Sequence, residues 1–454
     1  MGSESWQHDA PAGASARTRA ATWSVLTRGV QATASLATVA LVSLRVDAST
    51  QGYFYSCLAL IAFLPLAEFG VSYAVMQSAS HEAGQLRWTP AGLDGTPRGL
   101  ERIAALFRVA RRWNLAATLA ATGLLAWLGW IVLRAGGPTP PRLSWQWGAL
   151  LASAAAWQLL SPHIAILEGA GLVEQVWRFR LFQEVLGAAV VIGGLWVGLG
   201  LLSPAVALAA RVLHAGRWLS RPTRALPPAG GIQHGTAVSH WRLEVWPFQW
   251  RVGVSILCGF LIYYLFTPVL LAAQGPVVAG RFGMSLALAG GLQSATTAWM
   301  NSQAPHFGAL VAAGKYPTLD ADFARTFKHS TLLAALGAAS MLVALIWLTV
   351  LLPNLASRLL PPVSFGLLMA AAVVNHVVFA LSVYLRAHRR DPLLLPSLVG
   401  AAAMTIGLLW TSRSGTPNVF AGMYFVFTVV GLAMAIAIFV SCRRRWHLVP
   451  MANH

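Results

Sequence analysis

Long apolar stretches separated by short polar segments run along almost the whole chain. Each stretch contains roughly 20 residues, the length that an α-helix needs to cross the hydrocarbon core of a bilayer. The pattern therefore predicts an all-α polytopic membrane protein with about twelve transmembrane helices. The stretches lie at 21–44, 53–76, 113–133, 145–168, 181–200, 202–219, 248–271, 284–307, 331–352, 363–385, 393–411 and 418–441.

Two sequence patterns occur once in each half of the chain. Gly-x-Phe-x3-Leu-Ala-Leu occurs at 52–60 and 280–288, and Trp-x4-Arg occurs at 23–28 and 246–251. Because an even number of spans separates the copies, the halves should have the same orientation, related by an axis along the membrane normal. Such parallel repeats are typical of transporters, in which the substrate binds between the halves.

Composition supports the membrane prediction and charge gives the orientation. The chain is 57% hydrophobic and 10% charged, which excludes a soluble domain, and it carries a net charge of +18. With the N-terminus inside, 25 of the 32 Lys and Arg residues fall in cytoplasmic segments and six in outer ones. This asymmetry predicts that both termini are cytoplasmic. The same distribution explains the net positive charge, because the cytoplasmic Lys and Arg residues face anionic lipid. We therefore expect no nucleic-acid partner.

The repeat and the orientation together predict the domain organisation. The Pro- and Gly-containing stretch between the two repeats is expected to link two six-helix bundles. The predicted segments are a cytoplasmic N-terminal tail (1–20), a first six-helix bundle (21–219), a cytoplasmic linker (220–245), a second six-helix bundle (246–442) and a cytoplasmic C-terminal tail (443–454).

Amphipathic stretches follow the second and eighth spans. At 96–112 and 318–328, apolar residues recur at helical spacing on one face. We expect both stretches to lie in the plane of the lipid headgroups.

No pattern in the sequence indicates an enzyme. The predicted outer loops are short, whereas a polymerase or glycosyltransferase that works on the outer face usually has a large external loop or domain. No nucleotide-binding loop, metal cluster or nucleophile–base arrangement stands out. We therefore expect a non-enzyme without cofactor or metal, driven by an ion, voltage or substrate gradient.

Polar residues form stripes on four of the predicted spans. Intramembrane charges cost about 2.5–3.5 kcal/mol at the helix centre, so they usually face the bundle interior or a wet cavity. The stripes therefore predict a hydrated substrate cavity. Its candidate residues are Arg28, Gln31 and Ser35 on the first span, Glu68 and Ser72 on the second, Arg251 and Ser255 on the seventh, and Gln293, Thr297 and Asn301 on the eighth.

A simpler interpretation exists for several of these residues. Ser and Thr can bond helix to helix, and Arg28 and Arg251 can extend to the cytoplasmic interface. For Arg251 both interpretations stay open, whereas for Arg28 and Glu68 the cavity is favoured.

Glu68 and three further ionisable residues have other candidate roles. Glu68 and His376 are candidates for ion coupling, although a hydrogen-bonded packing role is favoured for His376. Glu168 and Glu184 are expected to form ion pairs with Arg178 or Arg180.

Motifs spread over nearly the whole chain resemble those of bacterial oligosaccharide flippases of the O-antigen and teichoic-acid exporter type, in the multidrug/oligosaccharidyl-lipid/polysaccharide exporter superfamily. They are Leu44-Arg45, Gln51-Gly52-Tyr53-Phe54, Glu68-Phe69-Gly70, Ser80-His81-Glu82, Leu167-Glu168-Gly169, Trp246-Pro247-Phe248-Gln249, 275–280 with Phe282-Gly283-Met284-Ser285, Ala304-Pro305 with Phe307-Gly308, and 384–388.

The resemblance implies a fold like that of multidrug and toxin extruders (MATE transporters), with two six-helix bundles around a cavity that opens alternately to each side. It implies a flippase that moves a polyprenyl-diphosphate-linked oligosaccharide across the cell inner membrane, as a multi-pass protein, during surface polysaccharide biosynthesis. Arg28 and Arg251 would bind the diphosphate. Implied partners are the lipid-linked oligosaccharide, membrane lipids, a polysaccharide polymerase and glycosyltransferases.

Two other functions stay open from the sequence. One is an ion-coupled antiporter of drugs or other small molecules with the same fold. The other is a membrane scaffold for polysaccharide assembly that transports nothing.

Overall fold

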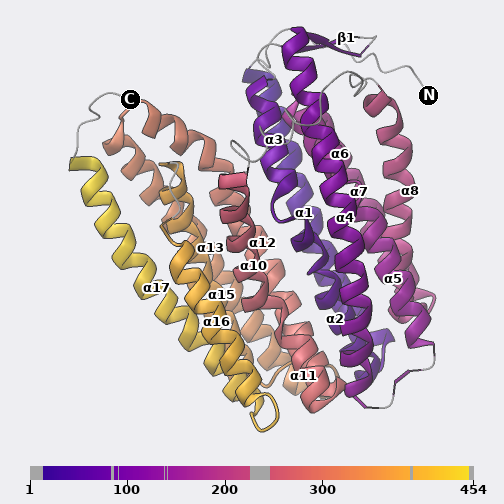
Figure 1. Cartoon of the computed structure of the whole chain (residues 1–454). Helices are drawn as coiled ribbons and strands as arrows, with labels where there is room; N and C mark the ends of the chain where they lie inside the picture. Colours follow the sequence, from indigo (N-terminus) through magenta and orange to yellow (C-terminus); the bar gives the residue numbers. More distant parts are fainter. Residues whose placement is uncertain are drawn as a thin grey trace. The chain divides into compact units, whose positions relative to one another are not determined.

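The computed structural model describes residues 14–82, 86–89, 92–137, 139–140, 142–224, 246–388 and 392–448, and these residues are almost entirely helical (Figure 1). Most of the predicted linker and parts of both predicted tails lie outside the described residues.

The first half of the chain contains α1 (Ala14–Arg45), α2 (Ala48–Ile61), η1 (Leu64–Glu68), α3 (Val71–Glu82), β1 (Leu86–Thr89), β2 (Gly92–Gly95), α4 (Pro97–Ala135), α5 (Leu143–Gln158), α6 (Ser161–Gly169), α7 (Val173–Trp196), η3 (Gly200–Leu202) and α8 (Ser203–Arg224). The second half contains α10 (Trp246–Tyr264), α11 (Phe266–Gln274), α12 (Pro276–Ala312), α13 (Tyr316–Leu351), α14 (Pro353–Ala356), α15 (Pro362–Ala387), α16 (Leu394–Thr411) and α17 (Pro417–Leu448).

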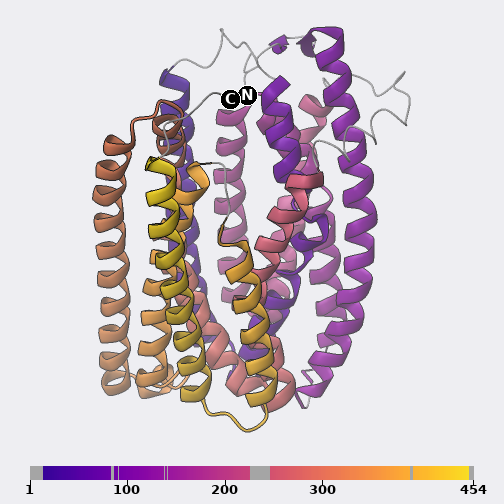
Figure 2. The same cartoon turned by 60° about the vertical axis from the view of Figure 1, so that its left-hand side comes forward.

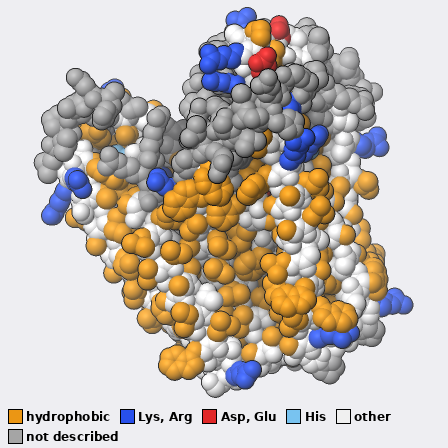
Figure 3. Space-filling view, in the orientation of Figure 1, with side chains coloured by type: hydrophobic (Ala, Val, Ile, Leu, Met, Phe, Trp, Pro, Cys, Tyr) orange, Lys and Arg blue, Asp and Glu red, His pale blue; other side chains and the backbone are white. Residues whose placement is uncertain are grey.

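The helices confirm the prediction of a multi-pass membrane protein. Each of the twelve apolar stretches overlaps one, two or three consecutive helices. Ten segments of the described chain are long and apolar enough to cross a membrane, and the more polar α8 and α12 correspond to the other two stretches. Large apolar side chains such as Trp410 and Leu213 are exposed to the surroundings. Figure 3 shows hydrophobic side chains along the sides of the helices and Lys and Arg near the helix ends.

The helices form two compact units. Unit 1 comprises the described residues within Met1–Val30, Leu60–Ile131 and Pro140–Leu257. Unit 2 comprises those within Gln31–Ala59, Val132–Thr139 and Cys258–His454. The helices α1, α2, α4 and α10 contribute residues to both units. The two six-helix bundles expected at 21–219 and 246–442 stay a prediction.

The core of unit 1 lies between α3, α4, α6, α7 and α8, and that of unit 2 between α12, α13, α15 and α17. In unit 2, α16 and α17 form an antiparallel pair joined by a short turn (Figure 2).

The two amphipathic stretches are the first turns of membrane helices. Residues 97–112 continue without a break into the rest of α4, and 318–328 continue into α13 (Figure 1). Ile103 is fully buried in the core of unit 1, and Phe323 is buried in the core of unit 2. The predicted position in the headgroup plane is therefore wrong, because the apolar faces are covered by protein instead of lipid.

A β-hairpin, which the sequence pattern did not predict, precedes α4. Strands β1 and β2 pair antiparallel with Leu86 opposite Gly95. Leu86 and Leu93 are buried in the core of unit 1, and Trp88 Nε1 donates a hydrogen bond to the Ala170 carbonyl at 2.9 Å. The hairpin is thereby fixed to the end of α6.

The two copies of the Gly-x-Phe motif pack against each other within unit 2. Gly52 of α2 lies against the backbone of Pro276, and Gly280 of α12 lies against the backbone of Gly52. Gln51 Nε2 donates a hydrogen bond to the Gly280 carbonyl at 2.9 Å. Small residues let two helix backbones approach closely, which explains why both copies of the motif begin with glycine.

We predict that Gly52→Ala destabilises the protein. A Cβ at this position would lie 2.6 Å from the Pro276 Cα, and a backbone atom cannot move aside as a flexible side chain can. Overpacking of this kind costs about 1–3 kcal/mol. Thermal unfolding in detergent should show a lower midpoint for Gly52→Ala. The control is Gly123→Ala, whose Cβ would have no atom within 4 Å. Equal midpoints for both variants would contradict the close approach.

Candidate ion-coupling and substrate sites

The second membrane span is broken in its interior. After α2, the short helix η1 ends at Glu68, and α3 begins only at Val71. Between them, Phe69 and Gly70 have φ angles of 52° and 79°, in the left-handed region that a non-glycine residue rarely adopts. Pro65 in the first turn of η1 and Gly70 are the residues that permit this geometry. Broken helices inside a membrane are tolerated where the freed backbone groups are buried in protein or line a cavity.

The fourth span is broken in the same way. α5 ends at Gln158 and α6 begins at Ser161, with Pro162 in its first turn. Within unit 1, α3 and α6 pack side by side. Two half-helices therefore begin next to each other, and each has a partial positive charge at its N-terminal end.

The Glu68 carboxylate lies at the N-terminal ends of α3 and α6. Its Oε2 atom accepts hydrogen bonds from Ser72 Oγ at 2.7 Å, Ser161 Oγ at 2.7 Å and Gln158 Nε2 at 3.2 Å. The two hydroxyl oxygens are themselves 3.0 Å apart. Trp113 Nε1 donates a hydrogen bond to the Glu68 carbonyl at 3.2 Å, which holds the broken backbone in place. All three donors to the carboxylate are neutral.

No Lys or Arg among the described residues forms an ion pair with Glu68. The negative charge is stabilised by neutral donors and by the two helix N-termini instead. A half-buried carboxylate held in this way can exchange a proton or a small cation without breaking a salt bridge.

A second charged group of residues lies between α1 and α7 in unit 1. Arg19 pairs with Glu174 at 3.0 Å, and Arg178 lies over the ring of Trp23 at 5.8 Å. One turn further along α1, half-buried Arg28 interacts electrostatically with Arg180 and Glu184 of α7.

The acids of this group are already bonded to other arginines. Arg180 binds both carboxylate oxygens of Glu168, at 3.1 and 2.6 Å, and Arg211 binds Glu184 at 3.0 Å. Arg28 therefore lies beside a carboxylate, Glu184, that already binds another arginine.

The predicted pair of Glu168 with Arg180 is confirmed, whereas the prediction for Glu184 is wrong. Glu184 pairs with Arg211 of α8. Gly187 makes this possible, because any side chain at that position of α7 would overlap the Arg211 guanidinium.

In unit 2, the second half of α1 shares a polar face with α12. Gln31 Oε1 accepts a hydrogen bond from Ser294 Oγ at 3.4 Å, and Ser35 lies opposite Gly291. Half-buried Gln293 and Thr297 lie on the same stretch of α12, where Thr297 Oγ1 donates to the Gln293 carbonyl at 2.7 Å.

These features occur on a fold that is known from solved structures. The inward-facing conformation of a multidrug resistance MATE family transporter of the MOP superfamily covers 94% of this chain and 96% of its own, with a TM-score of 0.58 and 14% identity. The chain has the fold of MATE transporters. A eukaryotic MATE transporter covers 95% of this chain and 97% of its own (TM-score 0.60, 12% identity).

The same fold is shared with a flippase. The inward closed conformation of the lipid II flippase MurJ covers 94% of this chain and 90% of its own, with a TM-score of 0.60 and 10% identity. At identities this low, the likeness shows the fold alone. No protein-family model and no curated protein sequence matches the chain.

The MATE fold brings some predicted site residues together and not others. Glu68 and Ser72 are in direct contact, and Gln31 and Ser35 lie on the face shared with α12. Ser255 is half-buried on α10, and Asn301 is exposed in the last third of α12.

Arg251 is exposed and lies over the Trp250 ring at 5.6 Å, a geometry that fits an arginine at the membrane interface. His376 is fully buried, and its Nε2 lies 3.0 Å from Ser330 Oγ. This contact fits the packing interpretation of His376.

Three residues of the Glu68 group were missed from the sequence: Trp113, Gln158 and Ser161. One signal was available, because Ser161-Pro162 interrupts the fourth apolar stretch and Gln158 is a polar residue beside it. A Ser-Pro pair inside a membrane span, close after a glutamine, predicts a break in the helix, where the freed backbone groups need hydrogen-bond partners.

We predict that Ser161→Ala costs about 1.5–3 kcal/mol, because a hydrogen bond to a charged group is lost. Thermal unfolding in detergent measures the cost. The matched control is Ser80→Ala, since the exposed Ser80 hydroxyl donates to the Gln77 carbonyl of its own turn. In a Glu68→Gln background the Ser161→Ala change should cost clearly less. The same cost in both backgrounds would show that Ser161 does not act through the carboxylate.

Proposed function

We propose that the protein flips a polyprenyl-diphosphate-linked oligosaccharide across the cell inner membrane by alternating access, during surface polysaccharide biosynthesis. The MATE fold supports a transporter. The solved structures with a similar fold also include a lipid II flippase. The resemblance of the sequence motifs to oligosaccharide flippases supports the substrate class.

The position of Arg28, half-buried on a membrane helix beside Arg180 and Glu184, is the observation that carries the proposal. A charge within a membrane helix is costly, so a half-buried arginine there needs a compensating role. A diphosphate that moves through a low-dielectric interior needs the opposite charge, and a guanidinium can bind two phosphate oxygens at once. Arg28 would bind the diphosphate while the polyprenyl tail stays in the bilayer and the glycan follows through the cavity.

Glu68 would supply the coupling to an ion gradient. Its carboxylate lies at a break between half-helices, the kind of position at which transporters bind coupling ions. Uptake or release of a proton or cation there would change the bonds that join α3 to α6. The chemistry of the pathway also implies partners: glycosyltransferases that build the lipid-linked glycan and a polymerase that consumes it outside.

The same Glu68 geometry favours a second candidate function, an ion-coupled antiporter of small molecules. In that case the neutral-donor pocket at the helix break would be the main site, and the charge at Arg28 would not matter for transport. The two candidates therefore differ in what they require of Arg28.

We predict that Arg28→Ala lowers the rate of flipping at least tenfold. Loss of a charge-assisted contact of about 1.5–3 kcal/mol corresponds to a factor of about 10 or more. The measurement is the rate at which a fluorescent polyprenyl-diphosphate oligosaccharide moves between the two leaflets of proteoliposomes that contain the protein. Arg28→Lys should fall between wild type and Arg28→Ala, because it keeps the charge and loses bidentate binding. Arg413→Ala, which changes an exposed arginine in the turn before α17, is the control.

In cells, deletion of the gene should make the lipid-linked intermediate accumulate on the inner leaflet. Of wild type, Arg28→Ala and Arg413→Ala, only wild type and Arg413→Ala should reverse this accumulation when they are expressed in the deletion strain. If Arg28→Ala leaves drug efflux at the wild-type rate and no lipid-linked glycan moves, the antiporter is favoured. Full function after neutralising the whole polar face of α1 would favour a scaffold instead.

A further inference from the structure

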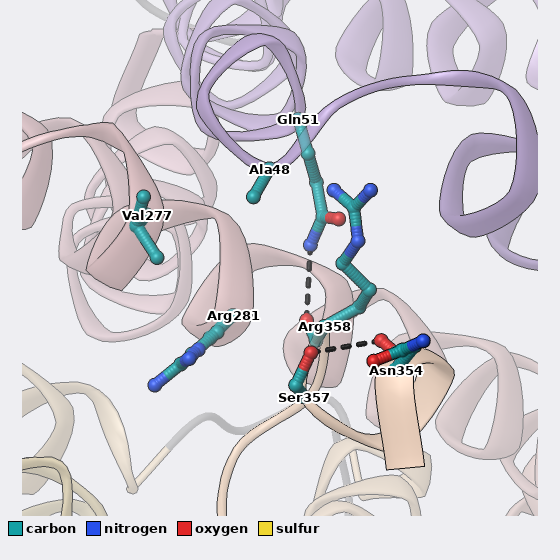
Figure 4. A pocket seen from close by; sticks show the side chains of 7 residues that line it. All are labelled: Ala48, Gln51, Val277, Arg281, Asn354, Ser357 and Arg358. Carbon is teal, nitrogen blue, oxygen red and sulfur yellow. Dashed lines mark hydrogen bonds between the residues drawn. The ribbon is translucent and has the colours of Figure 1, made fainter. Parts of the chain in front are cut away.

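A cavity of about 310 Å³ lies in unit 2, and none of the residues grouped around Glu68 or Arg28 lines it (Figure 4). It is lined by the first turns of α2 and α12 and by α14 with the turn that follows it. Gln274 Nε2 donates hydrogen bonds to the carbonyls of Ser412 and Gly415, so the turn before α17 lies at the same end of the unit. By the distribution of Lys and Arg, this end is the expected outer one.

Gln51 presents an unused acceptor to this cavity. It is 1% exposed, and its Nε2 donates hydrogen bonds to the Gly280 carbonyl at 2.9 Å and to the Arg358 carbonyl at 3.0 Å. Figure 4 shows the second of these bonds. Two carbonyl acceptors fix the orientation of the amide, because only its nitrogen can donate. The oxygen Oε1 is buried and has no hydrogen-bond partner among the described residues. It is therefore available to accept a hydrogen bond from a ligand.

Two arginines supply unused donors. Arg281 of α12 and Arg358 of the turn after α14 both line the cavity. Figure 4 shows the Arg358 guanidinium beside the Gln51 amide, whereas the Arg281 side chain extends toward the opposite side of the cavity. Arg281 Nε and Arg358 Nη1 are buried without a partner in the described part of the chain. A buried donor of a charged group that makes no bond is costly, so the site is built for a ligand that accepts.

No acidic residue lines the cavity among the described residues. Asp47, the nearest acid in sequence, caps α2 by accepting from the backbone N–H groups of Ser49 at 3.0 Å and Thr50 at 2.9 Å. Burial raises the pKa of Asp47, but the bonds from Thr50 and Ser49 outweigh burial and hold its pKa below the usual value. The Asp47 carboxylate therefore binds the N-terminal end of α2. The first turn of α12, which contributes Val277, adds a further partial positive charge.

We propose that this cavity binds a phosphoryl anion that also carries a hydroxyl group. The phosphoryl oxygens accept from Arg281 and Arg358, and the hydroxyl donates to Gln51 Oε1. The volume suffices for a small headgroup. Two sources offer this chemistry: inorganic phosphate in its monohydrogen or dihydrogen form, and the glycerol phosphate headgroup of phosphatidylglycerol. The site lies outside the proposed transport residues, and the inference does not rest on the proposed function.

A bound anion would join three elements that the cavity brings together. Gln51 belongs to α2, Arg281 to α12 and Arg358 to the turn before α15. The ligand would therefore reinforce the close packing of α2 on α12 at Gly52 and Gly280. Stability of the folded protein in the presence of ligand is the direct readout.

The experiment measures thermal unfolding of the full chain in two media. In neutral detergent, inorganic phosphate is titrated against sodium chloride of equal ionic strength. In nanodiscs, phosphatidylcholine alone is compared with phosphatidylcholine containing phosphatidylglycerol. Arg281→Gln/Arg358→Gln removes both cations, and Ser357→Asp adds a negative charge at the exposed rim of the cavity with little effect on packing. Arg413→Gln, an exposed arginine at the same end of unit 2, is the matched control.

We expect wild type and Arg413→Gln to be stabilised by phosphate, phosphatidylglycerol or both. Ser357→Asp and the double variant should need at least tenfold more ligand for the same stabilisation. A response to phosphate in detergent identifies the soluble anion, and a response to phosphatidylglycerol alone identifies the lipid headgroup. If neither ligand acts, or if both cavity variants respond like Arg413→Gln, the proposal is wrong.

Discussion

A carboxylate inside a membrane helix has to be stabilised by something other than water, and in this protein the solution involves two helix breaks at once. Glu68 ends η1, and its side chain accepts bonds from Ser72, at the start of α3, and from Ser161, at the start of α6. Neutral hydroxyls and helix dipoles hold the charge. If either span continued as one regular helix, the N-termini that face the carboxylate would not exist. The two breaks and Glu68 therefore depend on each other.

The charges of unit 1 are arranged in two different ways. Glu168 and Glu184 are bonded by Arg180 and Arg211, so each of these acids has a fixed cation. Among the described residues, the Glu68 carboxylate accepts hydrogen bonds from neutral donors, whereas Arg28 lies beside Glu184, a carboxylate that Arg211 already binds. Fixed pairs hold α6, α7 and α8 together. In the proposed function, Glu68 responds to an ion and Arg28 to a phosphate.

The sequence predicts the spans well, because both the length of an apolar stretch and a single charge within it are local signals. Glu68 and Arg28 could be singled out for that reason, and the paired Gly-x-Phe motifs indicated a repeat. The sequence does not show that Gly52 and Gly280 pack against each other, because that contact depends on how α2 crosses α12. The partners of Glu68 were missed because Gln158 and Ser161 are neutral and lie 90 and 93 residues away.

The central claim is that Glu68 couples transport to an ion gradient. The most direct measurement compares wild-type and Glu68→Gln protein in proteoliposomes, with and without an imposed proton or sodium gradient, using the fluorescent lipid-linked oligosaccharide. The amide keeps the shape of the side chain and removes its charge. The account predicts that a gradient accelerates transport by the wild type and has no effect on Glu68→Gln. An equal acceleration of both proteins would contradict it.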